Sequence, residues 1–203
     1  MPNLRSCLPR LLAALLLALS LAGCGYNEIQ TQDQGVKAAW AEVLSQYQRR
    51  ADLIPNIVNA VKGEANFEQD TLTKVIEARA KATSIQVTPE LANDPQALKN
   101  FQQAQGELSS ALSRLLVVSE NYPSLKTNQG FQDLRVELEG TENRIAIARN
   151  RYIKSVEGYN VFIRQVPQNF TAMVMGYKEK PQFAVDNEKA LATPPTVDFG
   201  GKK

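Results

Sequence analysis

The chain has 203 residues, of which 43% are hydrophobic and 22% charged, enough for one folded domain with a sizeable core. It has 23 basic and 21 acidic residues, and this balance argues against nucleic acid as a partner, because such binding needs excess positive charge. Histidine is absent, which removes the commonest general base and metal ligand, so we expect no metal site and no cofactor.

The first 24 residues have the features of a secretory signal. Arg5 and Arg10 precede a short run of Leu and Ala, and the segment ends in Leu-Ala-Gly-Cys at Cys24. This ending resembles the lipobox of bacterial lipoproteins, in which the cysteine is alkylated by diacylglycerol and signal peptidase II cuts before it. We therefore predict that residues 1–23 are removed and that lipid on Cys24 holds the chain to a membrane.

Two other interpretations of the leader are an uncleaved transmembrane helix and an ordinary signal with a chance cysteine. The apolar run is short of the roughly 20 residues that a membrane-spanning helix needs. Gly25 follows the cysteine where Asp would signal inner-membrane retention in many Gram-negative bacteria. The predicted location is the cell envelope, at the outer membrane facing the periplasm if the host has one.

The first apolar stripe of the mature chain has helical spacing and contains a proline. Its members recur three, four or seven residues apart: Val36, Trp40, Val43, Tyr47, Ile54, Ile57 and Val61. Pro55 lies inside the stripe, and a proline in a helix interior removes a hydrogen bond. The apolar phase continues through Leu72, Val75 and Ile76 and fades near Ser84. The pattern favours a kink at Pro55, but it leaves open a division into two helices.

Two further long helices are predicted. Asp94 and Pro95 form a start signal for the second, and Asn128 is a plausible cap for the third. The second carries an apolar stripe of Leu98, Phe101, Leu108, Leu112 and Leu115. The third carries a sustained heptad of Phe131, Leu134, Leu138, Thr141, Ile145, Ala148, Tyr152, Ser155, Tyr159 and Phe162.

These elements predict an all-α protein, an up-and-down bundle of three to four long antiparallel helices. The predicted parts are a signal peptide (1–23), a lipidated cysteine with a short tether (24–30), the bundle (31–180) and an irregular tail (181–203). A short helix after Pro167 carries Phe170, Met173, Val174 and Met175, and Tyr177 follows them. These side chains could contact a membrane or a partner, but we favour packing over the open end of the bundle.

Several motifs resemble the LemA family, in the same order over about residues 26–184. They are Ala39-Trp40, Arg49-Arg50-Ala51-Asp52-Leu53-Ile54-Pro55-Asn56, Val61-Lys62-Gly63, Glu77-Ala78-Arg79, Glu120-Asn121-Tyr122-Pro123-Ser124-Leu125-Lys126 and Leu138-Glu139-Gly140-Thr141-Glu142-Asn143-Arg144-Ile145. The resemblance implies a helical bundle outside the cytoplasm, tethered at its amino end and without an established enzymatic activity. Some relatives take part in building bacterial membranes, and relatives are often encoded beside TPM-domain membrane proteins.

The polar motif residues admit two interpretations. Arg49, Arg50, Asp52 and Asn56 could bind an acidic group. Alternatively, Arg50 lies on the core seam and needs a carboxylate partner, because an unpaired buried charge is costly. We favour an ion-pair network that fixes helix register. Its candidate members on the third helix are Glu137, Glu139, Glu142, Asn143, Arg144 and Arg149.

The carboxylates Glu137, Glu139 and Glu142 also invite an enzyme interpretation. Paired carboxylates can act as acid and base, and the alternative function is therefore an envelope hydrolase or another carboxylate-based enzyme. Because such positions normally hold salt bridges between helices, we expect the chain not to be an enzyme.

Tyr122, Pro123 and Lys126 lie in a predicted turn between helices, which could be structural or could dock a partner. The sequence as a whole predicts a lipid-anchored envelope scaffold or adaptor for a membrane protein, and TPM-domain proteins are one class that the resemblance suggests. A homo-oligomer is also compatible with it.

Overall fold

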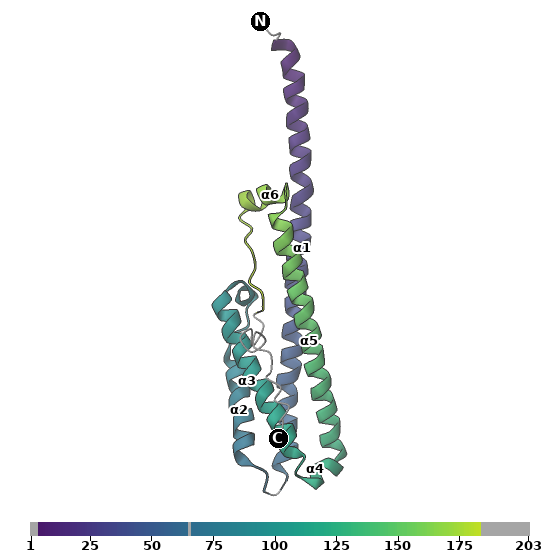
Figure 1. Ribbon diagram of the computed structural model, residues 1–203, viewed down its shortest axis with the longest axis vertical. Coiled ribbons are helices and arrows are strands. Elements are labelled where there is room, and N and C mark those ends of the chain that lie inside the picture. The colour runs from purple at the N-terminus through teal and green to yellow at the C-terminus, as the bar shows by residue number, and fades with distance from the viewer. Residues whose placement is uncertain (1–3, 65, 184–203) are drawn as a thin grey trace, which may run out of the picture.

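The computed structural model describes residues 4–64 and 66–183, with side chains from residue 25 onward except at 89 and 90. The elements in chain order are α1 (Leu4–Lys62), α2 (Gln69–Ser84), the 3-10 helix η1 (Pro89–Asn93), α3 (Pro95–Ser119), α4 (Pro123–Thr127), α5 (Gln129–Arg164) and α6 (Gln168–Met175). Four of these helices are long, and they run up and down in turn (Figure 1). The predicted all-α bundle is confirmed.

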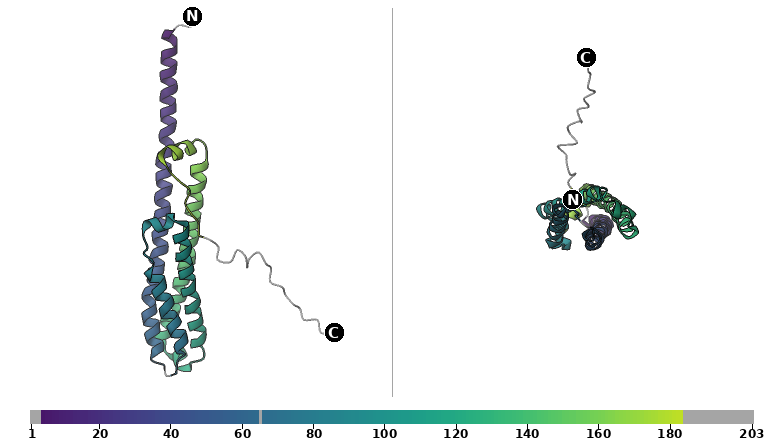
Figure 2. Two further views of the ribbon diagram at one scale, coloured as in Figure 1. Left: turned by 90° about the vertical axis from the view of Figure 1, so that its left-hand side faces the viewer. Right: turned by 90° about the horizontal axis from the view of Figure 1, so that it is seen from below.

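The bundle is built from two antiparallel helix pairs. We call both pairs hairpins, although α1 and α5 are not consecutive in the chain. α1 and α5 pack antiparallel, and α2 and α3 form a second, shorter antiparallel pair beside them (Figures 1 and 2). α1 has 59 residues, which at the usual rise gives a length of about 88 Å. No helix in the described part of the chain combines the length and the apolar content needed to cross a bilayer.

The predicted start signals of α3 and α5 act as caps. The carboxylate of Asp94 accepts hydrogen bonds from the backbone N–H groups of Gln96 and Ala97, at 2.8 and 3.1 Å, and Pro95 occupies the first turn. The side-chain oxygen of Asn128 accepts from the N–H of Phe131 at 3.0 Å. These bonds satisfy donors that the first turn of a helix leaves free.

Pro55 lies within α1, and the helix continues to Lys62. Because proline has no N–H, the carbonyl of Ala51 one turn earlier lacks its usual intrahelical partner. The Nε of Arg79 on α2 donates to this carbonyl at 3.0 Å. Since Ala51 is buried, the arginine satisfies an acceptor that water reaches poorly. Two separate motifs of the sequence thus meet at one hydrogen bond.

This hydrogen bond predicts a non-additive effect on stability. We expect Arg79→Met to lower the free energy of unfolding by about 1–3 kcal/mol, because it leaves the Ala51 carbonyl unpaired. In a Pro55→Ala background, residue 55 regains an N–H for that carbonyl, so the same substitution costs at least about 1 kcal/mol less. Urea unfolding of the four proteins measures both values, and equal costs in the two backgrounds would contradict the assignment.

The first apolar stripe belongs to two helices. α1 ends at Lys62 and α2 begins at Gln69, so the continuation toward Ser84 that the pattern predicts in one helix is wrong. Asn66 in the connecting turn has a positive φ of 68°, a conformation that asparagine tolerates better than most residues. Ile76 is 45% exposed although its spacing fits the stripe. The reversal brings α2 back along the bundle, where it forms the second hairpin with α3.

The heptad of α5 holds as far as Tyr152 and then shifts. Beyond that point Val156 and Ile163 are buried, in place of the predicted Ser155 and Phe162, which are half-buried. Tyr152 and Ile163 are eleven residues apart, which is one seven-residue repeat plus four inserted residues. Because an α-helix has 3.6 residues per turn, a straight helix drifts from a strict heptad, and such an insertion realigns the buried face.

Both ends of the predicted bundle need adjustment. Residues 24–30, predicted as a short tether, instead continue α1 as helix, and Ile29 there is fully buried. Phe183, in the predicted irregular tail, is buried among Trp40 and Tyr152, with ring centroids 5.9 and 5.2 Å away. The rest of the predicted tail, 184–203, lies outside the described residues, as does the side chain of Cys24.

Candidate functional site

Aromatic side chains join the two hairpins at the middle of the bundle. Trp40 and Tyr47 lie two turns apart on α1, and both contact Phe101 of α3. The ring centroids of Phe101 lie 5.8 Å from Trp40 and 5.3 Å from Tyr47, in edge-on geometry that aromatic pairs prefer. Phe101 is 1% exposed. This joint fixes how closely α3 approaches α1.

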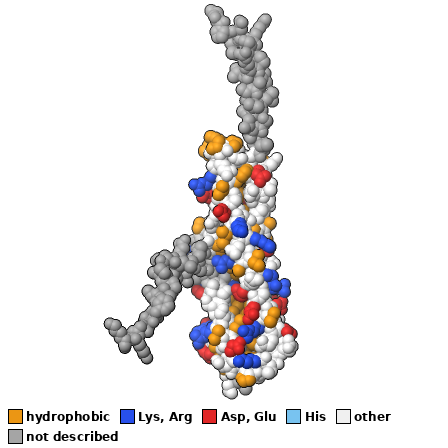
Figure 3. Space-filling model, turned by 45° about the vertical axis from the view of Figure 1, so that its right-hand side comes forward, with side chains coloured by type: hydrophobic (Ala, Val, Ile, Leu, Met, Phe, Trp, Pro, Cys, Tyr) orange, Lys and Arg blue, Asp and Glu red, His pale blue; other side chains and the backbone are white. Residues whose placement is uncertain are grey.

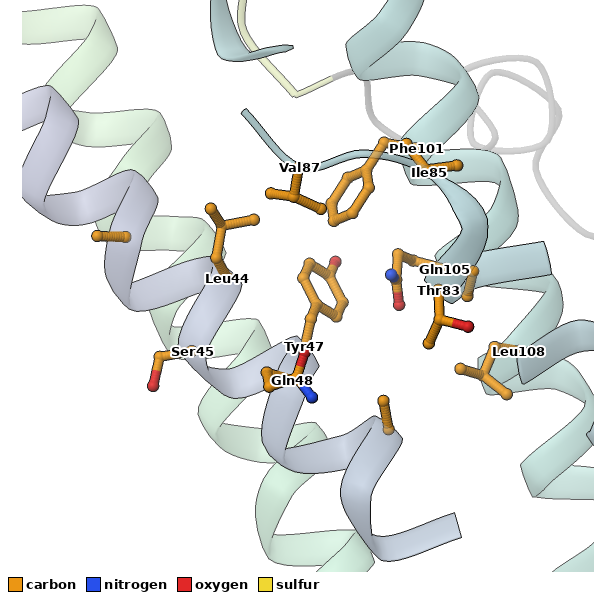
Figure 4. A pocket seen from close by; sticks show the side chains of 13 residues that line it. Leu44, Ser45, Tyr47, Gln48, Thr83, Ile85, Val87, Phe101, Gln105 and Leu108 are labelled. Carbon is orange, nitrogen blue, oxygen red and sulfur yellow. The ribbon is translucent and has the colours of Figure 1, made fainter. Parts of the chain in front are cut away.

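Beside the joint, the hairpins leave an apolar cavity of about 350 Å³, which we call the inter-hairpin groove. Tyr47 reaches from α1 toward Phe101 and Gln105 of the opposing hairpin (Figure 4). The groove is lined by Ala41, Leu44, Ser45, Tyr47, Gln48, Ala51, Ala82, Thr83, Ile85, Val87, Phe101, Gln105 and Leu108. Among the described side chains, none that lines the groove is charged.

A second cavity of about 640 Å³ shares three of these residues and continues along α1. The shared residues are Ala41, Leu44 and Val87, and Lys37 and Lys180 add positive charge to its wall. The two cavities together follow α1 from Val36 to Ala51, over about four turns. This surface can receive an apolar side chain or an extended apolar segment.

The polar side of Gln105 belongs to a cluster around Arg50, which is 1% exposed. Its Nη1 donates to Glu142 of α5 at 2.8 Å and to the Ser109 hydroxyl of α3 at 2.5 Å. Its Nη2 donates to the side-chain and backbone oxygens of Gln105. The guanidinium also lies 5.1 Å from the centroid of Tyr47. One arginine thus connects three helices.

Position in α1 explains why this arginine is buried. Arg50 lies seven residues after Val43 and four before Ile54, on the face that α1 presents to the core. A charge there needs a partner and further hydrogen bonds to offset its lost hydration. Of the three predicted partners, Glu142 forms the ion pair, and its side chain is 37% exposed. Nε of Arg50 is buried without a hydrogen-bond partner.

The other two carboxylates of the predicted enzyme cluster contact different arginines. Glu137 pairs with Arg49 at 2.9 Å, and Glu139 pairs with Arg135 within α5 at 3.0 Å. Each carboxylate therefore has its own cation, and they do not converge on one substrate position. Among the described residues, no group of three or more Cys, Asp or Glu side chains has an arrangement that could hold a metal ion.

The remaining predicted residues have local contacts or face solvent. Asp52 accepts a hydrogen bond from Gln48 at 2.7 Å, and Arg144 donates to Thr141 at 3.0 Å, both within one helix. Arg149 lies 5.0 Å over the ring of Phe183 and lines a small cavity of about 110 Å³ beside Arg50. The exposed residues of the set are Asp52, Asn56, Asn143 and Arg144.

The predicted docking turn contacts the turn between α1 and α2. The Tyr122 hydroxyl donates to the carbonyl of Asn66 at 3.0 Å, and its ring lies 4.8 Å from Phe67. Pro123 begins α4. Lys126 pairs with Glu120 at 3.4 Å. Arg135, which also binds Glu120, is the main cause that holds the pKa of this carboxyl below its ordinary value, and Lys126 adds to it. The turn thus holds the two hairpins together at this end.

A buried charge cluster at Asp33 was not anticipated from the sequence. Asp33 is 8% exposed and binds Lys180 at 2.8 Å and Lys37 at 2.7 Å. Burial alone would raise the pKa of Asp33, but the two lysines outweigh burial and hold it below its ordinary value. Burial, with Asp33 nearby, raises the pKa of Tyr159 to about 12. The cluster attaches the segment after α6 to α1.

Sequence reasoning also missed the groove, because its lining residues come from both hairpins and from the connection between α2 and α3. Leu44 and Val87 are ordinary apolar residues in the sequence, and nothing in their local spacing sets them apart. Ala41 and Leu44 are apolar residues beside the predicted core stripe of α1, and this is the sequence signal that was available. It does not identify the opposing wall.

Comparison with known proteins gives several related sequences. Magnetosome protein MamQ of Magnetospirillum gryphiswaldense is 25% identical over 188 residues, which cover 85% of this chain and 68% of MamQ. Magnetosome protein MamQ 2 of Paramagnetospirillum magneticum is 24% identical over the same shares. Protein LemA of Metamycoplasma hominis is 28% identical over 134 residues, covering 66% of this chain and 54% of that protein.

The sequence model of the LemA family matches residues 39–199. The match includes α1 from Ala39, both hairpins, the joint at Phe101 and the Arg50 cluster. It agrees with the resemblance of the motifs and with the helical architecture. The chain belongs to the LemA family.

Proposed function

We propose that this protein is a lipid-anchored envelope protein whose bundle is a non-enzymatic scaffold or adaptor for a membrane-protein partner. Lipid on Cys24 supplies the anchor, as the Leu-Ala-Gly-Cys ending of the leader suggests. The inter-hairpin groove supplies the contact surface. A location at the outer membrane, facing the periplasm, follows for a host that has one.

The groove is the observation that carries the adaptor proposal. Its wall is apolar at Leu44, Ile85, Val87 and Leu108, and its polar groups are neutral. A cavity of this kind lowers the free energy of an apolar segment that leaves water. The described residues of its lining include no charged group for acid–base chemistry. Membrane proteins of the TPM-domain class are the candidates that the family resemblance suggests.

The enzyme alternative receives less support. Glu137, Glu139 and Glu142 each bind a separate arginine, and the Arg50–Glu142 pair connects helices at the centre of the bundle. The Arg50–Glu142 and Arg49–Glu137 pairs join α1 to α5, and this geometry fits the role of fixing helix register, which buried polar groups fulfil in some proteins.

In-cell photo-crosslinking tests the proposal. Photoreactive residues are placed at Ser45, Thr83 and Val87, which line the groove and are exposed, and at Asn143 and Val136 as exposed controls outside it. We expect one recurrent membrane protein from the groove positions and not from the controls. Crosslinks to the chain itself, or equal patterns from both sets, would contradict an adaptor role for the groove.

Mass spectrometry of the purified protein tests the anchor. We expect a mature chain that begins at Cys24 and carries diacylglycerol, whereas a Cys24→Ser chain lacks the lipid. A wild-type chain with an unmodified cysteine would contradict the lipid anchor and leave the crosslinking result to be interpreted by itself.

A further inference from the structure

α6 lies at the end of the bundle where α5 stops and α1 extends away (Figures 1 and 2). It is held against the first mature turns of α1. A Cβ placed on Gly25 would lie 3.4 Å from the Gln168 side chain and 3.7 Å from the Thr171 hydroxyl oxygen. After α6, the Tyr177 hydroxyl bonds to Gln30 of α1. The residue that follows Cys24 is therefore packed on α6.

The outer face of α6 is apolar and exposed. Ala172 is buried against the bundle, while the other face and the end of α5 expose a group that we call the α6 patch. Its members are Val166 (74% exposed), Phe170 (60%), Met173 (73%), Val174 (79%) and Met175 (53%). α6 contains no charged residue. Figure 3 shows hydrophobic side chains gathered on this end of the molecule.

This exposure corrects the expectation that these residues cover the open end of the bundle. The packing is done by Ala172 and Tyr177, and Gly176, with a φ of 75°, turns the chain back after α6. The four large side chains of the short helix point away from the core. A contiguous apolar group on a small domain is unfavourable in water and commonly marks a contact surface.

We propose that the α6 patch lies in the lipid surface of the membrane to which Cys24 is anchored, and that it sets the orientation of the bundle. The inference rests on the lipid anchor of the proposed function. Lipid attached to Cys24 leaves the chain one residue from Gly25, and so directly beside α6. The membrane surface must therefore pass this end of the bundle, where short apolar helices can lie in the interface.

Size and charge favour lipid over a second copy of the chain. Five side chains form a small surface beside the roughly 20–30 residues per partner that stable protein interfaces use. The flanking charges are few, since Arg164 is paired with Glu179 at 3.6 Å and Lys180 is bound to Asp33. Within the described segment after α6, Lys178 is an exposed cation. Insertion is therefore driven by apolar burial, with weak dependence on salt and on anionic lipid.

Site-directed spin labelling of the lipidated protein in vesicles tests this inference. The sequence after Cys24 contains no cysteine, so Met173→Cys gives one free thiol for a nitroxide. Val136→Cys is the matched control, an exposed apolar position (67%) near the start of α5, at the other end of the bundle. Vesicles are made of phosphatidylcholine, with and without phosphatidylglycerol. Collision rates with oxygen and with a water-soluble nickel complex report the depth of each label.

We expect the ratio of oxygen to nickel collisions to be at least about fivefold higher at residue 173 than at residue 136, because a membrane interior excludes the nickel complex. In polarised infrared spectra, the helices should be ordered along the membrane normal, and a Met173→Gln/Val174→Gln chain should lose this order. Similar ratios at both labels, in protein shown by mass to be lipidated, would overturn the inference and leave the anchor intact.

Two other results of these experiments would have different consequences. Spin–spin broadening at residue 173 that persists on dilution in lipid would mean that a second copy covers the patch, and it would overturn the inference. Absence of lipid on Cys24 would contradict the proposed function. In that case the unlipidated protein is added to the same vesicles, where a buried label at 173 still supports the contact and an exposed one overturns it.

Discussion

Replacing Phe101 with alanine is expected to lower the free energy of unfolding by about 3–5 kcal/mol, the range for a fully buried phenylalanine. Phe101 is 1% exposed and contacts Trp40 and Tyr47 across the joint between the hairpins. Its removal leaves a void that α3 can close only by moving against α1, and the polar cluster around Arg50 opposes that movement. Urea unfolding of the wild-type and variant chains measures the change.

Phe170→Ala is the matched control, since it deletes the same atoms from a side chain that is 60% exposed. We expect a change within about 0.5 kcal/mol in detergent solution. Hydrogen exchange should also accelerate in α2 and α3 more than in α1 and α5, because Phe101 connects the shorter hairpin to the longer one. A loss below 1 kcal/mol at Phe101, or uniform exchange, would contradict its role as the joint.

Glu142→Ala is the second large effect that we expect, a loss of about 2–4 kcal/mol. Removing one partner of a buried ion pair leaves the other charge without compensation, which costs about 3–5 kcal/mol when both are buried. Here Arg50 is 1% exposed but the Glu142 side chain is 37% exposed, so we expect a slightly smaller loss of unfolding free energy. The measurement is again urea unfolding, at constant pH and ionic strength.

Glu137→Ala provides the control, because its partner Arg49 is 53% exposed and such surface pairs contribute about 0–1 kcal/mol. A second test replaces both buried partners, in Arg50→Met/Glu142→Leu. We expect the double variant to be more stable than Glu142→Ala, since it contains no buried unpaired charge. If Glu142→Ala lowered the free energy of unfolding as little as Glu137→Ala, the prediction would be contradicted. The hydrogen bonds of Arg50 to Gln105 and Ser109 would then be sufficient to stabilise its buried charge.

Helix positions were largely predictable because their signals are local. Apolar residues at three- and four-residue spacing identify the buried faces of α3 and most of α5, and Asp94 and Asn128 cap the helices that follow them. The same local signals failed between Lys62 and Gln69, because the apolar residues on either side keep one phase. Whether a chain reverses there depends on the helix that it packs against afterward.

The sequence also indicated that Arg50 needs a carboxylate partner, since its spacing places it on the core face. It could not choose among Glu137, Glu139 and Glu142, which lie within two turns of one helix. The choice depends on the rotation and axial position of α5 relative to α1. Only the folded chain sets those quantities.

The amino-acid sequence by itself therefore determined the helical class, the caps, most of the buried faces and the family of this protein. Tertiary structure decided that α1 continues through Pro55 with a hydrogen bond from Arg79, that two hairpins leave a groove along α1, and that α6 exposes its apolar face. The physical reason is the separation along the chain over which each interaction acts. Periodicity and capping arise within a few residues, whereas these three features depend on groups that lie far apart in the chain and meet only after the helices have packed.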